Sequence, residues 1–190
     1  MDTELQIGIW NAWILMLYFP LHPLIMIIVD KAIGTGEIMN KMGDVPYEKG
    51  EKRAFLTAMF IMFLLLVYSV FLPLKLGVMW FYAGLIIYLV GLVVLLTAIV
   101  NIATSPVGQP FTQGMYRYSR HPMLFSGFII QLGVSVVTAS WIFLLLSIVA
   151  MFLQVSQAIA EERGCLATYG NAYREYLDRT PRWVGLPKVS

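Results

Sequence analysis

The sequence predicts an all-α, polytopic membrane protein with about five transmembrane helices, the N-terminus outside and the C-terminus in the cytoplasm. Of its 190 residues, 59% are hydrophobic and 13% are charged, whereas soluble domains are about half apolar and a quarter charged. The acidic residues fall within 2–51 and 161–178, so residues 52–160 contain no carboxylate. Apolar runs of about 20 residues, long enough to cross a bilayer, follow one another along the chain.

Five of these runs are predicted to span the membrane: residues 7–29, 54–74, 79–103, 122–138 and 141–160. Each is expected to be a helix, because backbone groups in lipid need internal partners and the alternation of barrel strands is absent. Pro20 and Pro23 lack an amide hydrogen and are expected to kink or interrupt the first span. Only Ala139 and Ser140 separate the last two spans, which predicts a tight helical hairpin.

The basic residues predict the orientation, since short loops rich in Lys and Arg stay on the cytoplasmic side. Twelve of the thirteen follow the first, third or fifth span, and Lys75 is the exception. One membrane domain is expected, with three helices in residues 1–103 and a cofactor-binding loop, a hairpin and a cytoplasmic helix in 104–190. The first span is expected to be retained, because no basic region of a cleavable signal peptide precedes it.

Several classes of function are disfavoured. Cys165 is the single cysteine and excludes an internal disulfide, and the absence of a Cys/His cluster argues against a metal site built by the protein. No basic stripe with interleaved aromatic residues points to nucleic acid. The expected surroundings are membrane lipids.

Two polar segments are expected to form one site at the cytoplasmic face. In the first, residues 104–124, Arg120 and His121 precede Pro122, which favours the first turn of a helix. Free amides at a helix start and a guanidinium suit an anionic ligand group. The second segment follows the fifth span and begins with Glu161 and Glu162. Because the hairpin brings the start of one span beside the end of the next, the four charged or titratable side chains are expected to converge.

A short amphipathic helix is predicted after this pair, over residues 172–178. Gly170 is expected to stop the preceding helix, Asn171 to cap the new one, and Thr180 and Pro181 to end it. This helix is placed so that it can cover the site.

Plainer interpretations of these residues stay open. Arg120 also suits a snorkelling anchor, and paired Glu residues also suit a solvated helix end. His22, between two prolines, is expected to be neutral and hydrogen-bonded in a structural role, although ionisable groups inside a span are rare. Three glutamines are expected to form hydrogen bonds between helices: Gln131, Gln154 and Gln157.

The two segments resemble the isoprenylcysteine carboxyl methyltransferase and phospholipid methyltransferase family of integral membrane enzymes. The resemblance is carried by GMYRYSRHPMLFSGFIIQLG and EERGCLATYGNAYREYLDRTPRW, which hold an RHP segment and a downstream EE pair in the family's order. It covers roughly the C-terminal 80 residues. The family's Tyr two residues after the Pro is Leu124 here, which puts any contact of that hydroxyl in doubt.

The resemblance implies S-adenosylmethionine as the methyl donor. Arg120 and His121 suit its carboxylate, while Glu161 or Glu162 suits its ammonium or ribose. The same resemblance places the remaining cofactor contacts at Gly114, Met115, Tyr116, Pro122 and Leu124. Catalytic roles are expected for the Glu pair, as a proton acceptor, and for Arg174, Arg179 or Arg182, which would orient an anionic acceptor.

The acceptor is expected to be lipophilic and to partition into the membrane, either a prokaryotic cytoplasmic membrane or the endoplasmic reticulum. Prenylated cysteine, phospholipid amine, quinone-like and small thiol acceptors all fit. Two other functions stay open. Sterol reductases, which use NADPH, have a related C-terminal region, and a non-catalytic membrane subunit would retain the same fold.

Overall fold

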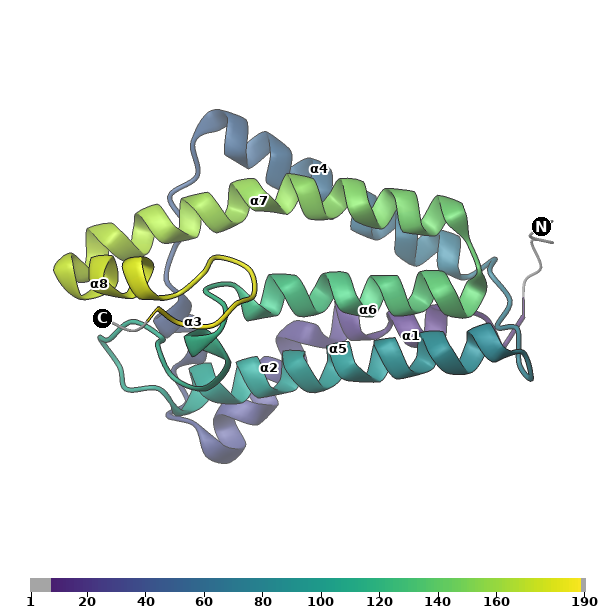
Figure 1. The fold of residues 1–190 in the computed structure, drawn as a ribbon, viewed down its shortest axis with the longest axis horizontal. Coiled ribbons are helices and arrows are strands. Elements are labelled where there is room, and N and C mark those ends of the chain that lie inside the picture. Colours follow the sequence, from purple (N-terminus) through teal and green to yellow (C-terminus); the bar gives the residue numbers. More distant parts are fainter. Residues whose placement is uncertain (1–7, 189–190) are drawn as a thin grey trace.

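In the computed structural model, which describes residues 8–188, the chain is a bundle of helices joined by loops, of which the one between residues 104 and 122 is long (Figure 1). Ile7, the first residue of the first predicted span, lies outside the described residues. The described elements are the α-helices α1 (Trp13–Met16), α2 (Tyr18–Ile33), α3 (Ile38–Met42), α4 (Lys49–Ser69), α5 (Met79–Thr104), α6 (Pro122–Thr138), α7 (Trp141–Tyr169) and α8 (Asn171–Arg179), and the 3₁₀ helix η1 (Gly114–Arg117).

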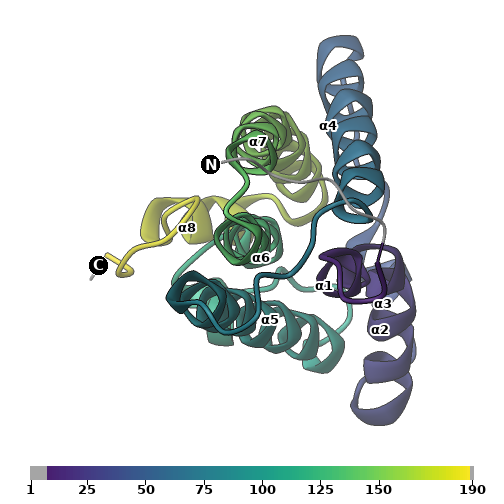
Figure 2. The same cartoon turned by 90° about the vertical axis from the view of Figure 1, so that its right-hand side faces the viewer.

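The chain passes along the bundle five times, through α1 and α2 together, then α4, α5, α6 and α7 (Figure 1). Four segments are long and apolar enough to cross a membrane: Trp13–Ile33, Lys49–Ser69, Met79–Thr104 and Trp141–Tyr169. The fifth, α6, has 17 residues, about 25 Å against a hydrocarbon core of about 30 Å. It lies between α5 and α7 at the centre of the bundle (Figure 2). The polytopic helical fold is therefore confirmed.

The predicted interruption of the first span is present, whereas the predicted start of the second span is wrong. The first span breaks at Leu17, three residues before Pro20, because a proline ring clashes with the carbonyl four residues earlier, here that of Met16. The second helix begins at Lys49, not at residue 54. Glu48 and Glu51 form a capping box there, and the backbone amide of Glu48 donates to the Glu51 carboxylate at 2.9 Å.

The last long helix continues nine residues beyond its predicted end at residue 160. Because α7 runs to Tyr169, Glu161 and Glu162 stand on a rigid helix and not at a frayed end. The predicted amphipathic helix is present as α8. Its N-cap is Gly170, at φ 55°, and its first residue is Asn171. No side chain in the described part of the chain caps this helix start. The expected Asn cap was wrong because the tight turn places the capping residue at a positive φ, which glycine adopts without strain.

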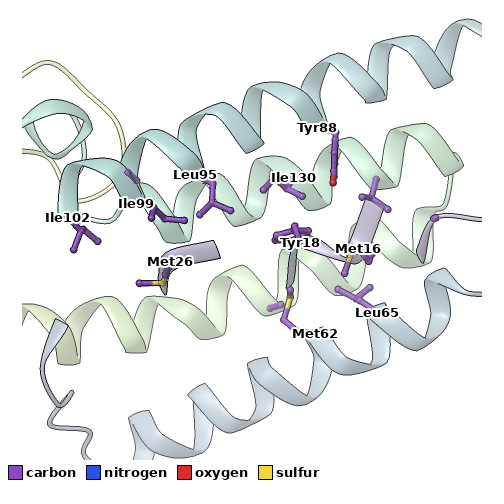
Figure 3. Close-up of a cluster of buried hydrophobic side chains, with 14 of the residues drawn as sticks. Met16, Tyr18, Met26, Met62, Leu65, Tyr88, Leu95, Ile99, Ile102 and Ile130 are labelled. Carbon is purple, nitrogen blue, oxygen red and sulfur yellow. The ribbon is translucent and has the colours of Figure 1, made fainter. Parts of the chain in front are cut away.

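Close backbone packing joins α5 to α6. A Cβ at Gly84 would meet the backbone of Val137, and one at Gly133 would meet the backbone of Tyr88. Small residues let helices approach closely where lipid offers no hydrophobic driving force. The buried cluster beside this contact includes side chains from several helices (Figure 3), so α6 has a fixed position against α5.

We expect Gly133→Ala to lower the melting temperature in detergent, because the methyl group has no room against Tyr88. Gly127→Ala is the matched control, because it makes the same change in the same helix where no atom lies within 4 Å. Alanine favours a helix interior over glycine by about 1 kcal/mol, so this control should match or exceed the wild type. Equal melting temperatures for both variants would contradict the packing argument.

Lys41 fixes the end of α5 from which the loop toward α6 departs. Its Nζ is buried and donates to the carbonyls of Ile102, Ala103 and Ser105 at 3.2, 2.7 and 2.7 Å. The last carbonyls of a helix have no partner within it and carry partial negative charge. This lysine therefore serves as a cap for α5, in addition to its place among the basic residues that set the predicted orientation.

Candidate active site

The loop between α5 and α6 is held from both sides at one end of the bundle. Asn101 of α5 accepts from the backbone amide of Met115 at 2.9 Å, and the hydroxyl of Tyr176 in α8 donates to the carbonyl of Tyr116 at 2.7 Å. The backbone amide of Arg120 donates to the carbonyl of Pro181 at 3.1 Å. The loop and the C-terminal tail thus fix each other's backbone next to the start of α6.

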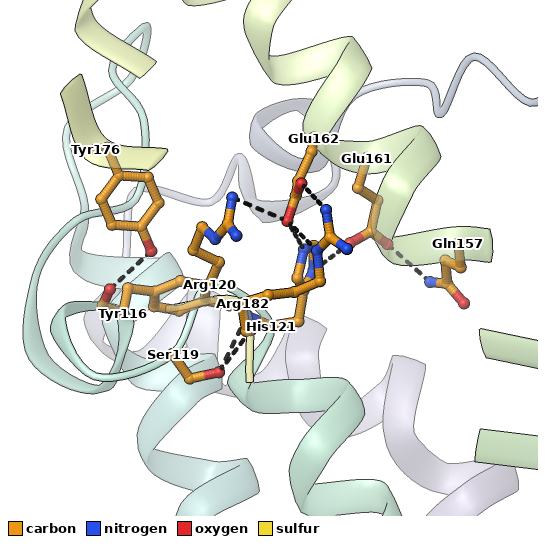
Figure 4. Close-up of polar contacts among 9 residues, drawn as sticks. All are labelled: Tyr116, Ser119, Arg120, His121, Gln157, Glu161, Glu162, Tyr176 and Arg182. Carbon is orange, nitrogen blue, oxygen red and sulfur yellow. Dashed lines mark hydrogen bonds and ion pairs between the residues drawn. The ribbon is translucent and has the colours of Figure 1, made fainter. Parts of the chain in front are cut away.

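His121 bridges the two glutamates of α7. Its Nδ1 lies 3.1 Å from Oε2 of Glu161, and its Nε2 lies 3.1 Å from Oε1 of Glu162 (Figure 4). His121 is the N-cap of α6, and its side chain is 5% exposed. The imidazole therefore links the start of α6 to α7, and the residues expected to converge do lie together.

Glu162 organises three cations. Its Oε1 lies 3.2 Å from Nη1 of Arg120, and its two oxygens accept from Nε and Nη2 of Arg182 at 2.9 and 2.8 Å. With the imidazole of His121 as the third partner, this buried carboxylate is fully engaged. Such paired hydrogen bonds to a guanidinium fix its plane as well as its position. Glu162 thereby ties the loop, α7 and the tail into one cluster.

Glu161 has a different environment. Oε1 accepts from Nε2 of Gln157 at 2.7 Å within α7, and the side chain is 27% exposed. Glu161 lines a cavity, and Glu162 is not among the residues that line it. The two adjacent carboxylates therefore face different surroundings, one toward the cavity and the other into the ion-pair cluster.

The charges of the cluster depend on His121. Burial alone would favour its neutral form, but the hydrogen bonds and negative charges of Glu161 and Glu162 outweigh burial and raise the pKa of His121 above 6.5. The same carboxylate of Glu162 raises the pKa of Arg182. With the imidazole protonated, Arg120, His121 and Arg182 outnumber the two glutamates, so the cluster carries a net positive charge.

A cavity of about 520 Å³ extends from this cluster into the bundle, a size typical of small-molecule sites. Arg120, His121 and Glu161 line its polar end, together with the aromatic rings of Tyr116, Tyr173 and Tyr176; apolar side chains such as Met59, Met62 and Leu95 line the part inside the bundle. The buried Nε of Arg120 has no hydrogen-bond partner among the described residues. The polar end therefore has an unused donor.

The structure separates the other residues expected at the site. Leu124 lines the cavity, whereas Gly114, Met115 and Pro122 are not among its lining residues. A Cβ at Gly114 would collide with Asn101, so this glycine serves the fit of η1 against α5. Pro122 is buried as the first residue of α6.

The C-terminal arginines divide into two groups. Arg174 is exposed, and Arg179 forms a 3.1 Å ion pair with exposed Glu175; neither lines the cavity. Arg182, one of the three alternatives that the sequence left open, is the one joined to the cluster. No sequence signal distinguishes it from the other two arginines, because its position depends on tertiary contacts of the tail such as the hydrogen bond from Arg120 to Pro181.

The expectations for the uncharged polar residues of the spans are met only in part. Gln157 bonds within its own helix, to Glu161, whereas Gln131 does reach another helix by donating to Sδ of Met62 at 3.1 Å. His22 was expected to be hydrogen-bonded, yet its buried Nε2 has no partner in the described part of the chain. His22, Gln131 and Gln154 all line the cavity.

Comparison with known proteins identifies the family. A family model described as Phospholipid methyltransferase matches residues 76–172, about half of the chain. The match includes η1, Arg120, His121 and both glutamates, and it ends before Arg182. A search of curated proteins finds no match. The chain belongs to the phospholipid methyltransferase family of membrane proteins.

Proposed function

We propose that the protein transfers a methyl group from S-adenosylmethionine to a lipophilic acceptor that enters from the membrane, with its active site on the cytoplasmic side. The observation that carries this proposal is the cavity, which joins a charged cluster at the polar end to an apolar interior. A soluble charged donor and a membrane-borne acceptor need these two environments. Membership of the family supports methyl transfer as the reaction class.

The polar end fits the chemical groups of the cofactor. Arg120 has a buried Nε without a described partner, and its net positive surroundings suit an α-carboxylate. Glu161 faces the cavity and suits an ammonium or a ribose hydroxyl, whereas Glu162 is already engaged by three partners. The rings of Tyr116 and Tyr173 line the same end and suit an adenine ring or the face-on approach of a sulfonium cation.

When bound, the cofactor would supply an electrophilic methyl group on a sulfonium centre. The residues of the protein contribute position and shielding, which are the main requirements of an in-line displacement. Glu162 holds Arg120, His121 and Arg182 in place, and α8 with the tail closes this end of the bundle. If the acceptor is an amine, Glu161 is a cavity-lining carboxylate beside the cluster that can accept its proton; a carboxylate or thiolate acceptor needs no such step.

Calorimetric titration of the purified protein in detergent tests the proposed function. S-adenosylhomocysteine, the demethylated cofactor, is expected to bind at one site, and NADPH is expected not to bind. Binding of NADPH alone would favour a reductase, and binding of neither ligand would favour a non-catalytic subunit. Either of these two results would reject the proposal.

The affinity for S-adenosylhomocysteine is expected to fall as the pH rises through the raised pKa of His121. Below that pKa the imidazolium adds a positive charge beside the carboxylate site, and above it that charge is lost. The pH dependence should therefore lie above 6.5, the ordinary value for histidine. Titrations at several pH values check this, and His121→Gln is the control, because its affinity should be lower and should not change over the same pH range. An unchanged pH dependence in His121→Gln would assign the effect to the ligand's own amino group.

A further inference from the structure

The cavity has a second polar region deep inside the bundle. It is formed by Tyr18 and His22, which are one helical turn apart on α2, and by Gln131 on α6; all three line the cavity. Gln131 stands nine residues after Pro122, about 14 Å along α6 from the helix start at the polar end. We call these three residues the inner polar site.

Each residue of this site has one buried polar atom without a hydrogen-bond partner among the described residues. Among the described residues, buried side-chain atoms without a hydrogen bond are Tyr18 Oη, His22 Nε2, Asp30 Oδ1, Arg120 Nε and Gln131 Oε1. Four of these five belong to residues that line the cavity. The hydroxyl of Tyr18 interacts with the side chain of Gln131, but the pair does not have the full geometry of a hydrogen bond. Buried polar groups are nearly always paired, so their concentration along one cavity points to a ligand that pairs them.

The surroundings decide which chemical group fits. An acyl chain would leave the hydroxyl, imidazole and amide unpaired, so a plain hydrocarbon tail is a poor occupant. A phosphate is also a poor occupant, because the cationic side chains that line the cavity lie elsewhere. Arg120 and His121 are at the polar end, and Lys41 donates to three carbonyls of α5. The inner polar site therefore offers hydrogen bonds without compensating charge.

Building on the proposed methyl transfer function, we propose that the inner polar site binds a neutral hydrogen-bonding group of the acceptor, such as a hydroxyl or a carbonyl. The acceptor is then an amphiphile with a polar group at bilayer depth, and the site selects it over acyl-chain lipids. Because α2 packs on α5 while α4 packs on α7, and α2 and α4 both line the cavity, we expect the acceptor to enter between α2 and α4.

Binding of tritium-labelled 4-octylphenol to the purified protein in detergent tests this assignment, with unlabelled octylbenzene and 4-octylphenyl phosphate as competitors. Octylphenol and octylbenzene differ only in the hydroxyl group. We expect the phenol to bind at least about tenfold more tightly than octylbenzene, because pairing one buried polar group is worth that much in affinity. Any binding of the phosphate should be independent of Gln131, since the phosphate would stay with Arg120.

Gln131→Leu and Tyr18→Phe are each expected to reduce the preference for the phenol to within about threefold. Ser135→Ala is the matched control. It removes a buried hydroxyl one turn further along α6 that bonds to its own helix, at the carbonyl of Gln131, and does not line the cavity. This variant should keep the full preference.

Binding of S-adenosylhomocysteine is measured in every variant. Unchanged affinity shows that the variant is folded. It also shows that cofactor binding does not depend on the inner polar site, so the two proposals are tested separately. Octylbenzene binding as tightly as the phenol, a cavity that takes up neither probe, or a preference that survives both substitutions would overturn the assignment. Phosphate binding that depends on Gln131 would overturn the neutrality of the site. If the wild type did not bind S-adenosylhomocysteine, the proposed function would be rejected but the assignment of the inner polar site would not.

Discussion

Glu162→Gln should destabilise the protein and abolish binding of S-adenosylhomocysteine. In the wild type, the buried carboxylate of Glu162 pairs with Arg120, His121 and Arg182. The substitution leaves these three side chains around a neutral amide. Removing one partner from a buried ion pair costs about 3–5 kcal/mol. We expect a loss of that order in the free energy of unfolding, measured by denaturation in detergent, together with loss of the calorimetric binding signal.

Glu175→Gln is the matched control for this prediction. It makes the same chemical change in an exposed ion pair, with Arg179 at 3.1 Å, and exposed pairs contribute little to stability. Both stability and cofactor affinity should stay at wild-type values. If Glu162→Gln behaved like Glu175→Gln, the carboxylate could not be the centre of the cluster. The double variant Glu162→Gln/Arg182→Gln should lose less free energy of unfolding than the sum of the losses in the two single variants, because the two side chains share one interaction.

Glu161→Gln should weaken binding of S-adenosylhomocysteine about 10- to 100-fold and leave stability nearly unchanged. The amide oxygen can still accept from Nδ1 of His121, now 3.1 Å from the carboxylate, but the negative charge facing the cavity is lost. A hydrogen bond to a charged group contributes about 1.5–3 kcal/mol, which corresponds to this loss of affinity. Calorimetry and a melting curve on the same sample measure the two effects.

5′-Methylthioadenosine, which lacks both the ammonium and the carboxylate, identifies the group that Glu161 contacts. Its affinity should be the same for wild type and Glu161→Gln if the carboxylate pairs with the ammonium. An equal loss for both ligands would place Glu161 at the ribose instead. Unchanged affinity for both ligands would remove Glu161 from the cofactor site.

Local sequence signals account for most of the fold and for part of the site. Apolar runs between charged segments located the helices, and Pro122 set the start of α6. The two-residue turn at 139–140 required the RHP segment and the EE pair to lie at the same end of the bundle. This follows from chain connectivity and helix length alone, so it needed no knowledge of how side chains pack.

The sequence could not assign different surroundings to the neighbours Glu161 and Glu162. Adjacent residues on a helix point in different directions, and what each one faces is known only when the rotation of the helix in the bundle is known. Nor could it choose Arg182 over Arg179, since the path of the tail depends on hydrogen bonds such as that from Arg120 to Pro181. The capping of α5 by Lys41 could not be predicted either, because it depends on a tertiary contact between segments far apart in the sequence.

The sequence by itself determined a membrane bundle with one charged end and the residue types gathered there. Only the tertiary structure decided which of these residues face a common cavity and which stabilise the cluster behind it. It also placed Tyr18, His22 and Gln131 along the same cavity. The physical reason is that hydrophobic patterning specifies which segments enter the bilayer, whereas helix rotation and close packing, at contacts such as Gly133 against Tyr88, specify which side chains meet.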